Sequence, residues 1–128
     1  MDLKKLRFTP THEWVCLDGN EATIGISKFA VDQLTDLIMI ELPAVGTRLT
    51  AGKTFGEVES VKAVSDLYAP ISGTVVAVNG DVAANVQLLA EDPYDKGWLI
   101  KINACEPSEL SGLLDIEAYE ARIAAEEH

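Results

Sequence analysis

Turn residues divide the middle of this chain into short segments of similar length, and this spacing limits the folds that the chain can adopt. Clusters of glycine, proline, aspartate and asparagine recur between residues 18 and 93, and these are the residues that tight turns favour. The segments between the clusters are rich in β-forming residues, and we expect strands at 12–17, 21–26, 37–40, 54–60, 64–68, 74–78 and 98–102. Short strands at this spacing predict a mainly β fold, either a sandwich or a flattened barrel.

Three details of this β region make sharper predictions. The first two segments are expected to form a hairpin around Asp18-Gly19-Asn20. Residues 37–40 are a continuous apolar run, which predicts a strand buried on both faces. Trp14 and Trp98 are predicted to be core aromatics.

Two regions carry helix signals instead. Ser27 is expected to cap a short helix through Leu34, with an apolar side formed by Phe29, Ala30, Val31 and Leu34. At the carboxyl end, a short helix begins near residue 107 and is interrupted by Gly112. Asp115 can cap a second helix, in which four residues recur at helical spacing: Ile116, Tyr119, Arg122 and Ile123. We expect one domain over residues 1–128, with residues 107–128 as a helical extension packed on the β fold.

The net charge of the chain makes some classes of binding partner unfavourable. Acidic residues number 21 and basic residues 10, which gives a net charge of −11 at pH 7, and such a surface repels nucleic acid and anionic membranes. Hydrophobic residues make up 48% of the chain, enough to build a folded core. We find no run of membrane-spanning length and no signal peptide, and we expect a soluble protein. Its expected compartment is the cytoplasm, or the mitochondrial matrix if a presequence has been removed.

The two cysteines point to no redox or metal motif. Cys16 and Cys105 lie far apart, and neither belongs to a CxxC or Cys/His cluster. We expect free structural thiols, buried as isolated cysteines usually are, in a reducing compartment. A small thiol enzyme that uses His12 as the base for Cys16 stays open as an alternative, although no third orienting group is identifiable.

Two other motifs have simple interpretations. Gly46 and Gly52-Lys53-Thr54 resemble a phosphate-binding loop, but five residues separate the glycines where the loop requires four. A strand-like acidic segment then follows, so nucleotide binding is not expected. His12 and Glu13 are neighbours that point to opposite faces of a strand, so no metal site is expected.

Lys62 stands in an unusual setting. It lies between Val61 and Ala63 in a β-rich stretch with carboxylates on both sides, Glu57 and Glu59 before it and Asp66 after it. On composition alone, Lys62 would be interpreted as an ordinary solvated lysine. A lysine at the tip of a hairpin, however, is exposed enough for a modifying enzyme to reach.

The sequence around this lysine resembles the H proteins of the glycine cleavage system, a family of lipoyl carriers. The resemblance runs from about Phe8 to Ile102, and its landmarks are residues 11–15, 22–26, 41–43, 55–63, 69–73, 92–94 and 97–99. Its most specific part is Glu59-Ser60-Val61-Lys62-Ala63 in register with Pro70-Ile71-Ser72-Gly73. Biotin carriers typically flank their lysine with methionines, so Val61 and Ala63 favour lipoate.

The resemblance implies a fold and a site. The fold would be a mainly β sandwich of the lipoyl and biotinyl carrier type, with short peripheral helices, a carboxyl-terminal helix and the lysine hairpin at one end. Lys62 would carry lipoate in amide linkage, and Glu59, Ser60, Val61 and Ala63 would form the attachment hairpin. Thr11, Glu13 and Asp66 would line a cleft that shelters the loaded arm.

The resemblance also implies partners rather than catalysis. A pyridoxal-phosphate glycine decarboxylase would load an aminomethyl group, and a tetrahydrofolate-dependent aminomethyltransferase would remove it. A dihydrolipoyl dehydrogenase would reoxidise the arm, and a lipoate-attaching ligase would install it. The protein itself would be a carrier and no enzyme. Two competing hypotheses stay open: a related carrier that relays lipoate to other enzymes, and an interaction domain in which Lys62 is unmodified.

Three positions depart from the family pattern. Thr35 stands where the family commonly has glycine, which predicts an altered or strained turn after the first helix. Val86 and Ala90 stand where proline and asparagine are common, so the loop geometry there is expected to differ.

Overall fold

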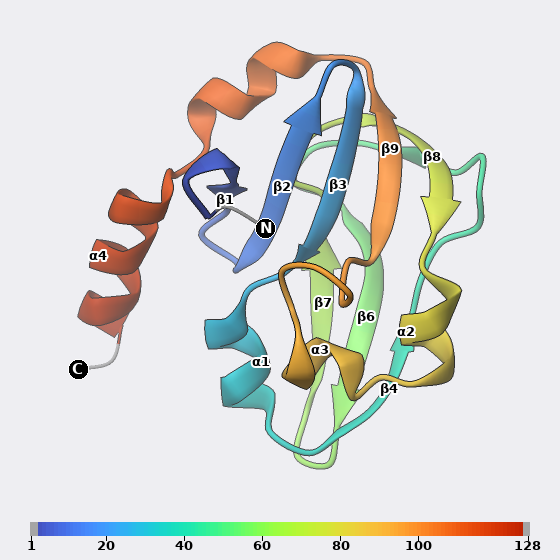
Figure 1. Ribbon diagram of the computed structural model, residues 1–128, viewed down its shortest axis with the longest axis vertical. Helices are drawn as coiled ribbons and strands as arrows, with labels where there is room; N and C mark the ends of the chain where they lie inside the picture. Colours follow the sequence, from blue (N-terminus) through green and yellow to red (C-terminus); the bar gives the residue numbers. More distant parts are fainter. Residues whose placement is uncertain (1–2, 127–128) are drawn as a thin grey trace.

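The chain folds into two antiparallel sheets that pack face to face. The computed structural model describes residues 3–126. The larger sheet has the order β1-β2-β3-β9-β8-β5 and the smaller one β4-β6-β7 (Figure 1). The strands of the larger sheet are β1 (Arg7–Phe8), β2 (Glu13–Asp18), β3 (Glu21–Ile26), β9 (Ile100–Ala104), β8 (Gly73–Val78) and β5 (Arg48–Leu49). Those of the smaller sheet are β4 (Leu37–Glu41), β6 (Thr54–Ser60) and β7 (Val64–Tyr68). The sheets are not closed into a barrel, so of the two predicted architectures the sandwich is correct.

Short helices surround the sheets. They are η1 (Leu3–Lys5), α1 (Lys28–Leu34), α2 (Gly80–Ala84), α3 (Leu88–Glu91), η2 (Pro107–Gly112) and α4 (Ile116–Glu126). The predicted caps are confirmed, because Ser27 Oγ accepts from Ala30 N at 3.3 Å and Asp115 Oδ1 accepts from Ala118 N at 2.8 Å. Neither α2 nor α3 was expected from the sequence. No helix within residues 3–126 is long and apolar enough to cross a membrane.

Two hydrophobic clusters hold the fold together. The larger lies between the sheets, and the smaller contains Leu6, Phe8, Trp14 and Tyr119, where α4 meets β1 and β2. Trp14 is fully buried as predicted, and its Nε1 donates to the carbonyl of Pro93 at 3.1 Å. Trp98 is a core aromatic only in part: it is half-buried and packs against the smaller cluster, with Lys101 Nζ 5.2 Å from its ring centroid.

Two burial predictions are wrong. Within β4, Ile38 and Met39 are about half exposed, at 52% and 49%, because this strand is an edge of the three-stranded sheet and a bulge interrupts its pairing with β6. Both cysteines are free as expected, but Cys105 is exposed and only Cys16 is half-buried.

The departure at Thr35 produces the strain that the sequence predicted. Thr35 ends α1 with φ 58° and ψ −130°, a backbone conformation in the positive-φ region that favours glycine. Val86 packs in the larger core, and Ala90 is exposed on α3.

Candidate functional site

Lys62 lies at the tip of the hairpin between β6 and β7. The strands pair up to Glu59 and Val64, so residues 60–63 form the turn. Ser60 closes this turn: its backbone N donates to the carbonyl of Ala63 at 2.8 Å, and its buried Oγ accepts from Ala63 N at 3.2 Å. The hairpin that the sequence singled out is therefore closed by hydrogen bonds, with Val61 and Lys62 exposed at its end.

A backbone hydrogen bond anchors the tip of the hairpin, whereas the Lys62 side chain has no such contact. Val61 N donates to the carbonyl of Asp36 at 2.9 Å, which ties the tip to the segment between α1 and β4. Within residues 3–126 the Lys62 amine forms neither an ion pair nor a hydrogen bond. The side chain of Lys62 is thus exposed, and its amine has no partner among the described residues.

A cavity of about 510 Å³ lies beside Lys62. It is walled by residues 10–13, by α1 and by β7, and it brings together five of the eight residues that the sequence placed at the site: Thr11, Glu13, Lys62, Ala63 and Asp66. The other three, Glu59, Ser60 and Val61, do not line it. Phe29, Ala30 and Leu67 add apolar surface. The cavity therefore combines an apolar wall with carboxylates, which suits an aliphatic arm that ends in a cation.

Glu13 is the buried carboxylate of this cavity, with a side chain only 1% exposed. Its Oε1 accepts from Thr9 Oγ1 at 2.7 Å and from Thr11 Oγ1 at 2.5 Å, and its Oε2 accepts from Tyr68 N at 3.3 Å. Burial raises the pKa of Glu13, and the hydrogen bonds partly oppose that rise. No ion pair satisfies the carboxylate within the described chain, so a cation that entered the cavity would find an unneutralised acceptor.

Asp66 differs from Glu13 in its surroundings. It is exposed on β7, directly across from Glu57 of β6, at the open side of the cavity. Thr11 is also exposed and contacts the cavity through the hydroxyl that it donates to Glu13. One carboxylate thus lies inside the cavity and one at its mouth.

Sequence reasoning did not place most of the cavity lining at the site, and three of the missed residues have aromatic side chains. His12, Phe29 and Tyr68 all line the cavity. His12 was considered only as a metal ligand or base, and the alternation of β7 gave no reason to single out Tyr68. The helix pattern did place Phe29 on the apolar side of α1, which was the one signal that the sequence offered.

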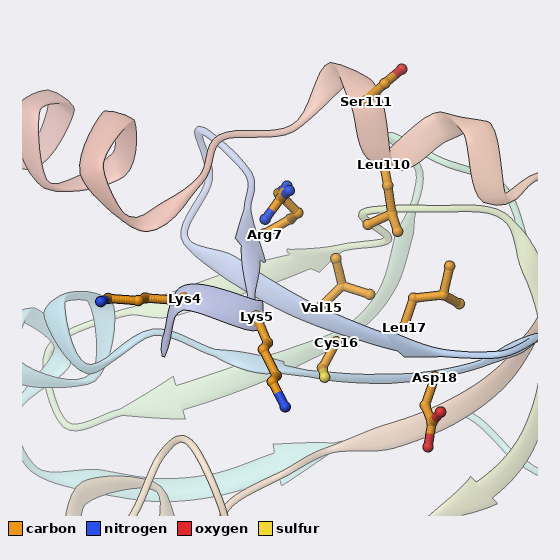
Figure 2. A pocket seen from close by; sticks show the side chains of 9 residues that line it. All are labelled: Lys4, Lys5, Arg7, Val15, Cys16, Leu17, Asp18, Leu110 and Ser111. Carbon is orange, nitrogen blue, oxygen red and sulfur yellow. The ribbon is translucent and has the colours of Figure 1, made fainter. Parts of the chain in front are cut away.

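The thiol-enzyme hypothesis finds no support in the geometry. Figure 2 shows Cys16 in a second cavity, of about 640 Å³, which is lined by Lys4, Lys5 and Arg7 but by no histidine. Both ring nitrogens of His12 are engaged elsewhere, Nδ1 with Tyr119 Oη at 2.8 Å and Nε2 with Glu126 Oε2 at 3.2 Å. His12 is therefore not placed to activate Cys16. Within residues 3–126 no cluster of three metal-ligating side chains occurs.

A two-sheet β fold that presents an unengaged lysine at the tip of a closed hairpin is the architecture of a carrier domain. The profile of the glycine cleavage H-protein family matches residues 6–126, and the chain belongs to that family. It is 51% identical over 123 residues to the glycine cleavage system H protein of Carboxydothermus hydrogenoformans, covering 96% of this chain and 95% of that one. It is 52% identical to that of Anoxybacillus flavithermus over 120 residues, or 94% of each chain.

A solved structure agrees with the fold. The crystal structure of a glycine cleavage system H protein from Mycobacterium marinum superimposes with a TM-score of 0.87 at 35% identity, covering 94% of this chain and 98% of that one. Both the predicted fold class and the family resemblance are therefore confirmed.

Proposed function

We propose that this protein is the lipoyl carrier of the glycine cleavage system, with lipoate in amide linkage to Lys62. The observation that carries the proposal is the unengaged Lys62 amine at the end of a hydrogen-bonded hairpin, beside a cavity that has an apolar wall and a buried carboxylate. An extended lipoyl-lysine arm is roughly 12–14 Å long by summed bond lengths, enough to reach into partner enzymes or back into this cavity. When bound, lipoate supplies the disulfide and dithiol chemistry that accepts the aminomethyl group of glycine.

The residues of the chain position and shelter that group. Ser60 keeps the hairpin closed, so that Lys62 is presented to the ligase in one geometry. Glu13, held by the hydroxyls of Thr9 and Thr11, provides a fixed acceptor for an ammonium group inside the cavity. Phe29 and Ala30 reduce the access of water to the same space. Together these residues would slow the hydrolysis of a loaded arm between visits to partners.

The proposal includes the partners and the boundaries of the carrier. The glycine decarboxylase, the aminomethyltransferase, the dihydrolipoyl dehydrogenase and the lipoate ligase would each bind the end of the molecule that carries Lys62. The cytoplasm is the proposed compartment. We also propose that residues 1–128 form one carrier domain, because η2 is tied to the β fold through Glu109, whose Oε1 accepts from Ser72 N at 2.6 Å.

Intact mass tests the attachment site. Protein purified from a lipoate-supplied host that carries the ligase should gain the mass of one lipoyl amide, and peptide mapping should place it on Lys62. Lys62→Arg should abolish the gain, whereas Lys53→Arg, which alters an exposed lysine of another turn, should leave it unchanged. An unmodified wild-type chain under these conditions would refute the proposal.

The lifetime of the loaded form tests the cavity. After loading with glycine and its decarboxylase, Glu13→Gln should lose the aminomethyl group faster than wild type and still be fully lipoylated. Glu91→Gln removes an exposed carboxylate from α3, which does not line the cavity, and is the matched control. Equal lifetimes for wild type and Glu13→Gln would contradict the role of Glu13. Lipoyl transfer to other enzymes without loading by glycine would instead favour a lipoate-relay carrier.

A further inference from the structure

The carboxyl-terminal helix α4 is joined to the cavity wall by a chain of hydrogen bonds. Tyr119 Oη lies 2.8 Å from His12 Nδ1 and 2.6 Å from Ser27 Oγ. His12 Nε2 lies 3.2 Å from Glu126 Oε2, about two turns further along α4. The chain thus links two sites on α4 to His12, which lines the cavity, and to Ser27, which caps α1.

When His12 is neutral, the donors and acceptors in this chain of hydrogen bonds have one consistent order. Ser27 Oγ accepts from Ala30 N and donates its hydroxyl proton to Tyr119 Oη. Tyr119 then donates to His12 Nδ1, and His12 Nε2–H donates to Glu126. Burial lowers the pKa of His12 and raises the pKa of Tyr119 to about 12, so both neutral forms are favoured near neutral pH.

The chain of hydrogen bonds positions two parts of the cavity wall, the 10–12 segment and the start of α1. His12 adopts φ 78°, an uncommon conformation for a side-chain-bearing residue, and its carbonyl accepts from Ser27 N at 2.8 Å. Its ring lies 5.0 Å from that of Phe29, the first apolar residue of α1 in the cavity. The 10–12 segment and the start of α1 therefore meet at one point, and Tyr119 is bonded to both.

We propose that α4 is a latch on the arm cavity, in which Tyr119 and His12 are positioning residues that hold one wall closed. The inference rests on the proposed function, since the cavity is taken to be the shelter of the arm. When the latch is released, the wall opens and water reaches the loaded arm. The carboxyl-terminal helix would thus set how long the cargo survives, at a distance from Lys62.

The test compares two variants that each lose one tyrosine hydroxyl. Tyr119→Phe keeps the ring that stacks on Phe8 at a centroid distance of 4.3 Å, but it leaves His12 Nδ1 and Ser27 without their partner. Tyr94→Phe removes a hydroxyl that accepts from Lys28 N at 3.1 Å and does not line the arm cavity. Both variants loosen a contact to the start of α1, but only the first breaks the latch.

The first measurement needs no lipoate. Amide hydrogen exchange of the unmodified proteins should be about fivefold faster at Ser27 and Ala30 in Tyr119→Phe than in wild type or Tyr94→Phe. The amides of β6 and β7 should exchange at wild-type rates in all three. Equal exchange at Ser27 and Ala30 in the three proteins would refute the latch and leave the proposed function intact.

The second measurement follows the cargo itself. The reduced lipoyl dithiol is loaded without any partner enzyme by formaldehyde and ammonia, which form one S–C and one C–N bond and release one water. Intact mass then follows hydrolysis, which returns thiol, formaldehyde and ammonia. We expect a half-life about fivefold shorter for Tyr119→Phe than for wild type or Tyr94→Phe. If Lys62 takes no lipoate, the proposed function fails, whereas hydrogen exchange still decides whether α4 holds the wall.

A pH series separates positioning from a general loss of stability. The charged and titratable groups that face His12 are Glu126, Arg122 and Tyr119, all from α4, while α1 presents only the Phe29 ring. Protonation at Nδ1 turns this atom from an acceptor into a donor, so Tyr119 must then donate to Ser27 Oγ. This reversal leaves the hydroxyl proton of the buried Ser27 without the acceptor that it had, and we expect it to weaken the latch. The ratio of wild-type to Tyr119→Phe half-lives should fall toward one as His12 becomes protonated. A ratio that stays constant with pH would overturn the role of His12.

Discussion

Thr35 offers a way to stabilise this protein by removing a side chain. Its φ of 58° and ψ of −130° lie where glycine is favoured, and a residue held in such a region stores roughly 1–3 kcal/mol of strain. Thr35 is exposed, so its side chain contributes little packing that would be lost. We therefore expect Thr35→Gly to raise the free energy of unfolding.

The size of the gain follows from three opposing contributions. Relief of strain contributes about 2 kcal/mol, and the greater freedom of glycine in the unfolded chain removes about 0.5–1 kcal/mol. Loss of the partly buried hydrogen bond that Thr35 Oγ1 donates to the carbonyl of Leu34, 2.7 Å long, removes about 0.5 kcal/mol more. The net gain is about 0.5–1 kcal/mol, which corresponds to a rise in Tm of about 2–4 °C for a domain of this size.

Urea and thermal unfolding of three proteins check this reasoning. Thr35→Ala is the matched control, because it loses the same hydroxyl but keeps a Cβ in the unfavourable conformation. We expect Thr35→Gly to be more stable than wild type and Thr35→Ala to show no gain. If the glycine variant is less stable than wild type, or if alanine stabilises equally, then the turn is not strained and the reasoning fails.

Three further predictions concern stability. Gly25→Ala should lower the free energy of unfolding by about 1–3 kcal/mol in urea, because a Cβ there would clash with the Trp14 ring. Gly80→Ala has open space around it and should be tolerated, and equal effects of the two substitutions would contradict this reasoning. Glu109→Gln should lower the free energy of unfolding by about 1–2 kcal/mol in the same assay, because only one amide oxygen remains to accept from the two donors of Ser72. A variant as stable as wild type would show that these two hydrogen bonds contribute nothing to stability. The free energy of unfolding should decrease as pH falls below about 6.5 toward the lowered pKa of folded His12, because the unfolded state binds the proton more readily. Calorimetric scans of His12→Gln should show a flatter pH dependence in that window, and an unchanged slope would refute this role of His12.

Local signals carried most of the strand assignments. The segments 54–60 and 64–68 have the predicted bounds, because alternation and flanking turn residues mark both ends of these strands. The same reasoning found the β2–β3 hairpin and the cap of α1. In each case the interactions that define the element lie close together in sequence.

Elements that depend on distant contacts were not predictable. Strands β1 and β5 are two residues long and exist as strands only through pairing with β2 and β8. Helices α2 and α3 are about one turn each, too short for a helical period to appear in the sequence. The exposure of Ile38 follows from the edge position of β4, which no single strand reveals.

The site divides in the same way. Lys62 and its hairpin could be identified from a contiguous motif, whereas the bond between His12 and Tyr119 joins residues 107 positions apart. The burial of Glu13 was also hidden, since its neighbours in sequence include the exposed Thr11. Its burial arises because the 9–13 segment folds back on itself and β7 covers the carboxylate.

The proposed acylation of the Lys62 amine would leave the interactions of the folded state unchanged. Because this amine forms no ion pair or hydrogen bond with any described residue, conversion of the ammonium to an amide removes no folded-state interaction and only changes the net charge from −11 to −12. If Lys62 is acylated as we propose, a modified chain whose arm lies outside the cavity should melt at the same temperature as the unmodified chain. The fold would then give no sign of whether its lysine has been modified.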